Sequence, residues 1–269
     1  MSLKVLCVVS AGSAMAFALK YLEFKGNSLL AATSIFHQSS HKWIHNWDRR
    51  DASSIIKPHR KKKISIENME KMEAQLKPTA TRHIFLIRHG NYYSKEKEAE
   101  KQKLTSLGLI QADLVGQHLR DLKLDFSKIT HSTMIRAEET SKEIQKYFPD
   151  VPVEKNVLLE EGFPIQAEPV QCHFDDKSIH EDGPRIEAAF RKYFHRADAS
   201  QKTDSYEIIV CHGNVIRYFL CRLLQVPPEF WLNFTLLHCS MSRVSIDPEG
   251  YVNICAVGEI GFMPRDIMT

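Results

Sequence analysis

The sequence predicts an α/β fold over residues 80–269, with a mostly parallel sheet and helices on both of its faces. Two short apolar runs, at 83–87 and 207–211, are typical of strands that are buried on both faces. Segments with helical periodicity follow these runs, and strands that alternate with helices favour a parallel sheet covered on both sides. An uncharged stretch and a polar stretch come first, so we divide the chain into residues 1–23, 24–79 and 80–269.

The remaining elements of the predicted domain follow from local patterns. Thr105 can cap a helix with apolar residues at 107, 110, 114, 119 and 122. A strand is expected over 128–131 and a helix from about 135 to 148. Pro184 is expected to open a further helix, because proline suits the first helical position. A helix over 214–224 follows, and the turn sequence at 247–250 indicates a hairpin between two late strands.

Residues 5–19 carry no charge and lie between Lys4 and Lys20. This run is shorter than the roughly 20 residues that a membrane-spanning helix needs. However, Lys20 can snorkel, and the residues after it continue the apolar character. We therefore predict a membrane anchor over residues 5–22. A cleaved secretory signal is the alternative, because Ala-x-Ala patterns at 14–16 and 16–18 resemble cleavage sites, but no disulfide pattern follows them.

Residues 24–79 are rich in Ser, His, Lys and Asn and show little apolar periodicity, so we predict a linker. The linker contains Trp43 and Trp47, whose large apolar rings are costly to leave in water. We expect them to bury against the catalytic domain or against another subunit. His37, His41 and His45 recur at a spacing of four, but no carboxylate or cysteine accompanies them, and this does not favour a metal site.

The composition excludes several functional classes. A net charge of +3 is too small to indicate nucleic acid as a partner. The six cysteines include no C-x-x-C pair and mostly stand among apolar residues, which favours free, reduced thiols. A disulfide-rich secreted domain and a cysteine zinc site are therefore not expected. No metal or other cofactor is predicted.

Two histidines stand where the chemistry of an α/β sheet is usually found. His89 and His212 each follow a predicted buried strand and each precede a glycine. In open α/β sheets, ligands bind outside the carboxyl ends of the strands. Arg88 and Arg136 offer guanidinium groups that match the oxygens of a phosphate. These residues together predict a phosphate pocket that contains a nucleophile.

The chemistry of such a pocket follows from the residue types. A neutral imidazole at His89 can attack phosphorus in line and form a phosphohistidine, which water then hydrolyses. The positive groups would balance the charge on the equatorial oxygens. The leaving alkoxide needs a proton, and the carboxyl groups of Glu160 and Glu161 are the natural candidates for this acid.

The order of these motifs resembles that of a known family. The chain contains, in order, Arg88-His89-Gly90, Leu104-Thr105-x-x-Gly108-x-x-Gln111-Ala112, Ser132-x-x-x-Arg136-Ala137-x-x-Thr140, Leu159-x-Glu161 and His212-Gly213-Asn214. This order is similar to that of the histidine phosphatase, or phosphoglycerate mutase-like, superfamily over residues 80–269. The resemblance implies that His89 is the phosphorylated residue and Glu161 the acid. It also implies that the phosphoryl group is held by Arg88, Arg136 and His212, with Asn91 as a further substrate-binding residue.

Shorter segments resemble the mitochondrial serine/threonine-protein phosphatases of this superfamily, at residues 46–50, 81–89, 185–190, 195–198 and 261–264. The resemblance implies an N-terminal anchor in a mitochondrial membrane, the outer rather than the inner one. It implies phosphoprotein substrates, among them MAP kinase kinase kinases. It further implies assembly into a homo-oligomer through Trp47, Asp48, Arg49 and Arg50.

The chain departs from the family pattern at two places. Glu160 stands where close relatives carry arginine, which alters the charge next to the predicted acid. The sequence His238-Cys239-Ser240 replaces a more usual Asn-Gly-Ser, in a loop that we expect near the pocket.

Two other functions compete with a protein phosphatase. A phosphoglycerate mutase usually has serine and asparagine where this chain has Tyr92 and Lys95, and the bulky tyrosine does not suit a closed site for a small sugar phosphate. A non-catalytic scaffold that binds partners through the tryptophan linker is the second alternative. The complete set of candidate catalytic residues argues against it.

Overall fold

The computed structural model describes residues 42–56, 65–170 and 173–269. Residues 44–269 form one compact unit. The predicted membrane anchor over residues 5–22 lies outside the described residues. Within the described ranges, no helix is both long and apolar enough to span a bilayer.

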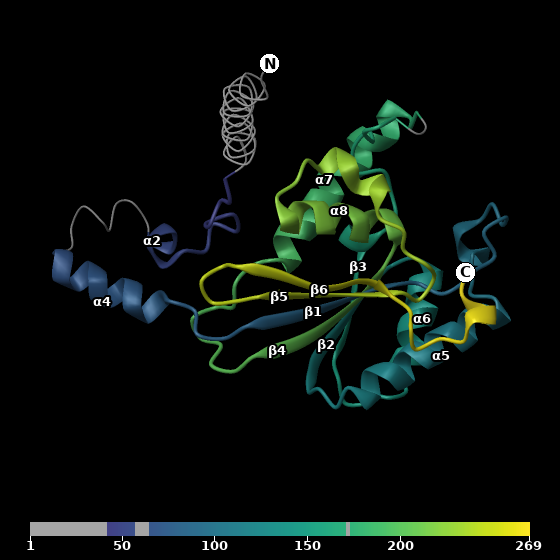
Figure 1. Cartoon of the computed structure of the whole chain (residues 1–269), viewed down its shortest axis with the longest axis horizontal. Coiled ribbons are helices and arrows are strands. Elements are labelled where there is room, and N and C mark those ends of the chain that lie inside the picture. The colour runs from purple at the N-terminus through teal and green to yellow at the C-terminus, as the bar shows by residue number, and fades with distance from the viewer. Residues whose placement is uncertain (1–41, 57–64, 171–172) are drawn as a thin grey trace, which may run out of the picture. The chain divides into compact units, whose positions relative to one another are not determined.

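A six-stranded sheet with the order β3-β2-β4-β1-β5-β6 forms the centre of the unit (Figure 1). Its strands are β1 (Arg82–Arg88), β2 (Phe126–Ser132), β3 (Val153–Asn156), β4 (Ser205–Cys211), β5 (Met241–Ile246) and β6 (Val252–Glu259). The pairs among β3, β2, β4 and β1 are parallel, whereas β5 pairs antiparallel with both β1 and β6. The sheet is mixed, but three of its five strand pairs are parallel, which agrees with the mostly parallel sheet that was predicted. The β5–β6 pair is antiparallel because the short turn between the two strands leaves no room for a crossover helix.

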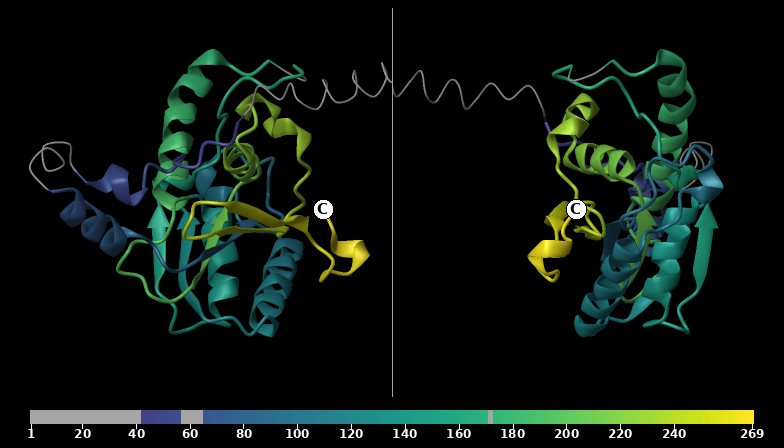
Figure 2. Two further views of the ribbon diagram at one scale, coloured as in Figure 1. Left: turned by 60° about the vertical axis from the view of Figure 1, so that its left-hand side comes forward. Right: turned by 90° about the vertical axis from the view of Figure 1, so that its right-hand side faces the viewer.

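Four helices cover the sheet, with α5 (Ser106–Asp121) and α6 (Ile135–Gln145) on one face and α7 (Asp176–Tyr193) and α8 (Gly213–Leu224) on the other (Figures 1 and 2). Strand β1 serves both faces, because successive side chains of a strand point to opposite sides. Ile84 and Leu86 belong to the apolar cluster under α7 and α8, and Phe85 and Ile87 to the cluster under α5 and α6. The prediction that this strand is buried on both faces is confirmed.

The predicted helix ends are partly correct. The side chain of Thr105 accepts a hydrogen bond from the Gly108 N–H and caps α5, as expected. The prediction that Pro184 opens a helix is wrong, because α7 begins at Asp176 behind the capping residue Asp175 and Pro184 lies inside it. The apolar face of α7 packs on the core beyond the proline, and this packing keeps the chain helical where proline would usually end a helix. Ile110, predicted to face the core from α5, is 52% exposed.

The stretch predicted as a linker is not entirely without secondary structure. It contains the single-turn helix α2 (Ala52–Ile55) and the eleven-residue helix α4 (Ile66–Leu76). Ser65 caps α4 by accepting from the Asn68 N–H, a local signal that the polar composition of the stretch obscures. Short 3-10 helices lie at η1 (Ala99–Lys101), η2 (Val157–Leu159), η3 (Pro228–Asn233) and η4 (Arg265–Ile267).

Candidate active site

The carboxyl ends of three neighbouring parallel strands bring the predicted site residues together. His89 follows β1, His212 follows β4 at the residue before α8, and Ser132 ends β2. Because β2, β4 and β1 are adjacent and parallel, these ends meet at one edge of the sheet. The rings of His89 and His212 have their centres 5.1 Å apart. Arg136 joins them from the first turn of α6.

The hydrogen bonds of His89 define its tautomer. Its Nδ1 lies 2.9 Å from the backbone oxygen of Gly90 and must donate to it, since a carbonyl only accepts. Its Nε2 therefore carries the lone pair, and it accepts a hydrogen bond from Nε of Arg136 at 3.2 Å. Burial lowers the pKa of His89 well below the ordinary value, and His212, Arg136 and Arg88 lower it further. The ring is neutral at physiological pH, as a nucleophile requires.

His212 is fully buried and is held by the end of β2. Its Nε2 lies 2.8 Å from Oγ of Ser132, and that oxygen accepts from the backbone N–H of Met134 at 3.3 Å. The hydroxyl of Ser132 can donate to Nε2, and in that arrangement the ring proton lies on Nδ1. Among the described residues, Nδ1 has no hydrogen-bond partner. Burial lowers the pKa of His212 well below its ordinary value, with Arg136 and Arg88 adding to the effect.

Arg136 is 5% exposed and contacts only uncharged groups. Besides the bond to His89, its Nη1 donates to Oε1 of Gln102 at 2.9 Å. Its guanidinium carbon lies 4.7 Å from the centre of the Tyr92 ring, within the range of a cation–π contact. The ion pairs found among the described residues do not include Arg136. The charge of Glu161 acts on Arg136, but the two form no ion pair, and a buried cation without an ion-pair partner is costly. This place therefore favours an anionic ligand.

Arg88 is held in a similar way by the loop before β5. Its Nη1 donates to the backbone oxygen of Leu236 at 2.6 Å, and its Nη2 lies 3.3 Å from Nε2 of His238. Within the part of the chain that the structure describes, its buried Nε has no acceptor. The ring of His238 lies 5.6 Å from that of His89, centre to centre, as expected for a loop near the pocket. The next residue, Cys239, has a positive φ of 54°, a conformation that favours glycine.

Glu161 lies in the field of these arginines. Its side chain is partly buried, and Oε1 accepts from the N–H of Gly162 at 3.2 Å. Burial raises the pKa of Glu161, while the Gly162 bond and the charges of Arg136, Arg88 and Arg217 oppose that rise. A carboxyl group with a raised pKa close to Arg88 and Arg136 is suited to give up a proton there.

Glu160, the other predicted candidate for the acid, makes different contacts. Its carboxylate accepts a hydrogen bond from the Thr133 hydroxyl, and its backbone oxygen accepts from Nη1 of Arg185 at 2.6 Å. Because Arg185 also donates to the backbone oxygen of Glu161, only the Thr133 contact of the carboxylate distinguishes Glu160, and the role of acid stays a prediction for either residue.

Asn91 belongs to the framework of the site. Its Oδ1 accepts from the hydroxyl of Thr105 at 2.8 Å, and its Nδ2 lies 3.5 Å from Oγ1 of Thr269. Its backbone N–H donates to Oε1 of Gln111 at 2.8 Å. The side chain thus joins the start of α5 to the last residue, and its role in binding substrate stays a prediction.

Sequence reasoning missed several residues of the site. Thr140 and Ser132 occur in the motif around Arg136, which could have identified them, and Thr140 accepts from the Gly90 N–H at 3.0 Å. Gln102 lies in a charged stretch that gives no signal of its own. Tyr92 was noted only for its bulk, although its ring contacts both Arg136 and His89.

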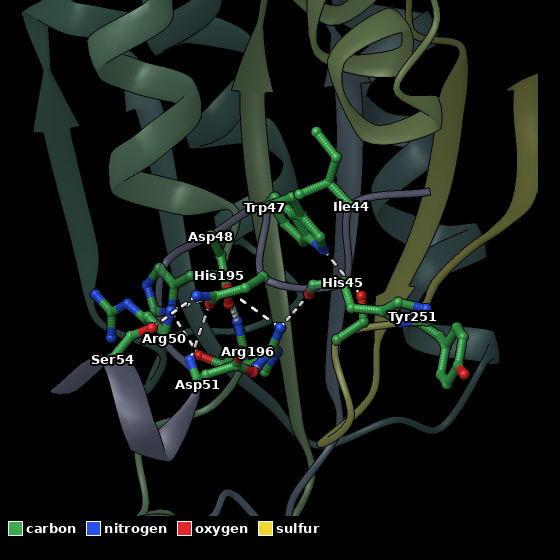
Figure 3. Close-up of polar contacts among 12 residues, drawn as sticks. Ile44, His45, Trp47, Asp48, Arg50, Asp51, Ser54, His195, Arg196 and Tyr251 are labelled. Atoms are coloured by element: carbon green, nitrogen blue, oxygen red, sulfur yellow. Dashed lines mark hydrogen bonds and ion pairs between the residues drawn. The ribbon is translucent and has the colours of Figure 1, made fainter. Parts of the chain in front are cut away.

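The segment predicted to mediate assembly lies on the domain of its own chain (Figure 3). Trp47 donates from Nε1 to the Gly250 oxygen at 2.9 Å, and its ring lies 5.9 Å from that of Phe190. Burial against the catalytic domain was one of the two expected outcomes. The neighbouring Asp48 accepts from the backbone N–H of Arg196 at 2.8 Å and forms an ion pair with its guanidinium at 3.4 Å.

The two arginines after Asp48 differ in their contacts. Arg50 forms an ion pair with Asp198 at 2.7 Å, in which the Arg50 side chain is partly exposed and the Asp198 side chain largely exposed. Arg49 is exposed and has a positive φ of 58°, which places it in a turn. The buried part of this contact is therefore made by Trp47 and Asp48.

Comparison with known proteins identifies a family and several similar chains. The model of the histidine phosphatase superfamily, branch 1, matches residues 84–255. The chain is 46% identical to the protein named serine/threonine-protein phosphatase PGAM5, mitochondrial, of Xenopus laevis, over 96% of both chains. It is also 46% identical to the Homo sapiens protein of that name, over 84% of this chain and 80% of the other. The crystal structure of a phosphoglycerate mutase from Plasmodium falciparum superposes with a TM-score of 0.50 at 35% identity, covering 70% of this chain and 96% of the other.

Proposed function

Because the chain belongs to the histidine phosphatase superfamily, we propose that it hydrolyses phosphoserine and phosphothreonine in proteins through a phosphohistidine at His89. One observation carries this proposal. Beside the neutral ring of His89, two buried nitrogens, Nε of Arg88 and Nδ1 of His212, have no partner among the described residues. Buried polar atoms are nearly always hydrogen-bonded, and the oxygens of a phosphoryl group would supply the missing acceptors.

In the first step, the lone pair on Nε2 of His89 attacks phosphorus in line. The bond between phosphorus and the serine oxygen breaks, and Glu161 gives its proton to that oxygen. Arg136 must first leave Nε2, and the phosphoryl oxygens offer its guanidinium a charged acceptor instead. The proton of His89 stays on Nδ1 and keeps its hydrogen bond to the Gly90 oxygen, which holds the ring in one orientation throughout.

In the second step, water attacks the phosphorus of the phosphohistidine. The carboxylate of Glu161 takes a proton from this water, the bond between phosphorus and nitrogen breaks, and His89 returns to its neutral form. Arg88, Arg136 and His212 hold the equatorial oxygens in both steps, and the two arginines balance their charge.

The choice of protein substrates rests on the curated relatives, which are named serine/threonine-protein phosphatases and mitochondrial. By the same resemblance we propose residence in the mitochondrial outer membrane through an anchor over residues 5–22. Stress-signalling MAP kinase kinase kinases are the substrates to test first. A phosphoproteomic comparison of cells with the parent protein and with His89→Ala would identify them. No change at serine and threonine sites would contradict this choice of substrate.

A phosphoglycerate mutase is the second candidate, because the similar Plasmodium falciparum structure bears that name. The centre of the Tyr92 ring lies 5.0 Å from that of His89, so a bulky side chain stands beside the nucleophile where such mutases usually have serine. Turnover of a phosphoserine peptide and of 3-phosphoglycerate by the full chain separates the two functions. Activity on the sugar phosphate alone would overturn our proposal.

We also propose that the chain forms a homo-oligomer through Trp47, Asp48, Arg49 and Arg50. The surface around Arg196 and Gly250, which receives this segment within one chain, would receive the same segment from a second copy. Trp47→Ala should lower the assembly state and reduce activity, since loss of an aromatic anchor costs about 2 kcal/mol or more. Unchanged sedimentation together with unchanged turnover would show that the segment is only a tether.

A further inference from the structure

The loop that follows His89 supports Arg136 from two directions. Gln102 accepts from Nη1 of Arg136 at 2.9 Å, and the Tyr92 ring lies against the guanidinium at 4.7 Å. Both residues belong to one loop, which is closed at its base by an antiparallel bridge between Tyr92 and Leu104. The Tyr92 ring also meets the His89 ring edge-on, with 5.0 Å between the ring centres.

The position of Arg136 creates a mechanical requirement. Its Nε–H occupies the lone pair of His89 that must attack phosphorus, so the guanidinium has to shift when a phosphoryl group arrives. A charged group that moves freely would lose its orientation and its partners. An aromatic face permits limited movement, because the attraction between ring and cation extends to about 6 Å from the ring centre and has no single required direction.

On the basis of the phosphohistidine mechanism proposed above, we propose that Tyr92 is a positioning residue that keeps Arg136 within reach of both His89 and the phosphoryl group. Gln102 supports the far end of the same guanidinium. The ring of Tyr92 spans the distance between Arg136 and His89, so one side chain orders both the phosphate-binding group and the nucleophile.

A purely structural role for Tyr92 must be separated from this one. The ring packs against the apolar cluster under α5 and α6, so its removal would also weaken packing. Phenylalanine and leucine both retain apolar bulk at this position, but only phenylalanine retains a π face. The comparison of Tyr92→Phe with Tyr92→Leu therefore isolates the contact with Arg136.

The experiment uses the full chain and p-nitrophenyl phosphate. We expect Tyr92→Phe to stay within about twofold of the parent, and Tyr92→Leu to lose roughly tenfold in kcat/KM, the rate equivalent of a cation–π contact of about 1.4 kcal/mol. The acid limb of the pH–rate profile should move to higher pH in Tyr92→Leu, since a displaced Arg136 no longer helps to lower the pKa of His89. In an Arg136→Met background, Tyr92→Leu should have no further effect.

Equal losses in Tyr92→Phe and Tyr92→Leu, or a full additional loss in the Arg136→Met background, would overturn the inference. Orthovanadate is a phosphate analogue, and its affinity can be measured without turnover. Loss of the cation–π contact should weaken vanadate binding roughly tenfold in Tyr92→Leu but not in Tyr92→Phe. If the parent protein binds vanadate but hydrolyses none of the phosphate esters, the proposed function is contradicted. The contact between Tyr92 and Arg136 can still be measured in that case through vanadate affinity. If Tyr92→Leu does not fold, Gln102→Leu removes the second support of Arg136 and carries the same test.

Discussion

Two regions of the molecule contain buried or half-buried arginines, and the partners of these arginines differ between the regions. Where the segment 44–51 meets the domain, Arg196 forms ion pairs with Asp48 and Asp51. At the candidate active site, Arg88 and Arg136 contact a backbone carbonyl, an amide, histidine nitrogens and an aromatic ring. In the first region, carboxylates of the same chain pair with the arginine. In the second region, no ion pair among the described residues includes Arg88 or Arg136, so their charge is available to a ligand. This difference in ion pairing identifies the site more clearly than burial does.

Arg82 and Arg136 allow the comparison to be tested directly. Arg82 is buried and paired with both carboxylate oxygens of Glu207 at 2.8 Å. Arg136→Met should lower kcat/KM for p-nitrophenyl phosphate roughly a thousandfold, or about 4 kcal/mol, the scale for loss of a group that stabilises transition-state charge. The melting temperature of the Arg136→Met variant should equal or exceed that of the parent, because the substitution removes a buried cation that has no carboxylate partner.

Arg82→Met is the matched control. It leaves Glu207 without its partner inside the protein, so stability should fall strongly. Activity per folded molecule should remain. A large loss of stability in Arg136→Met would show that its charge is structural and would break the contrast between the two regions.

The pair between Asp48 and Arg196 should give the second largest effect. The Asp48 side chain has no exposed surface and that of Arg196 is 3% exposed. Asp48→Ala should destabilise the unit by about 3 kcal/mol, near the low end for breaking a buried pair, because the segment can lift and let water reach Arg196. Chemical denaturation measures this difference. Asp198→Ala removes the exposed partner of Arg50 and should cost less than about 1 kcal/mol, so equal costs would contradict the distinction.

These contrasts show what the sequence could and could not predict. Arg88, His89, Arg136 and His212 were predicted because each follows a strand or begins a helix, and parallel strands bring such positions to one edge. The partners of these residues were harder to predict. Gln102 and Arg136 are 34 residues apart in the sequence, and their contact depends on how the charged loop folds.

The errors in the fold have similar causes. The turn at 247–250 predicted the hairpin of β5 and β6, but no local pattern indicates that β5 pairs antiparallel with β1. Proline is a strong local signal, but the packing of the apolar face of α7 outweighed it at Pro184. Tertiary contacts decided each of these cases, and they have no local pattern in the sequence.

The role of Glu161 can be tested with two substrates whose leaving groups differ in their need for a proton. Glu161→Gln should slow hydrolysis of a phosphoserine peptide roughly 100-fold, or about 2.7 kcal/mol, because a serine alkoxide departs poorly without a proton. p-Nitrophenyl phosphate should be much less affected, since p-nitrophenolate needs little protonation. Glu160→Gln is the adjacent control. Equal losses on both substrates would show that Glu161 only holds an arginine, and leaving-group dependence at Glu160 alone would transfer the role of acid to that residue.

The smallest effect concerns stability at low pH. The pKa of His212 is lowered in the folded state by burial, so the unfolded chain binds its proton first as pH falls. Stability should therefore drop between about pH 6.5 and the depressed pKa, by about 1.4 kcal/mol per pH unit for this residue. His212→Asn should remove that part of the slope, and denaturation curves at several pH values measure it. An unchanged slope would mean that His212 is charged in the folded protein.

Trapping of the covalent intermediate tests the central claim most directly. The full chain is mixed with a ³²P-labelled phosphoserine peptide, quenched in base within the first turnover, and digested. The account predicts label on the peptide that contains His89, stable in base and lost in acid, and no label in His89→Ala, which should fold normally. Label on another residue, acid-stable label, or activity of His89→Ala within about tenfold of the parent would contradict a mechanism that depends on a histidine nucleophile.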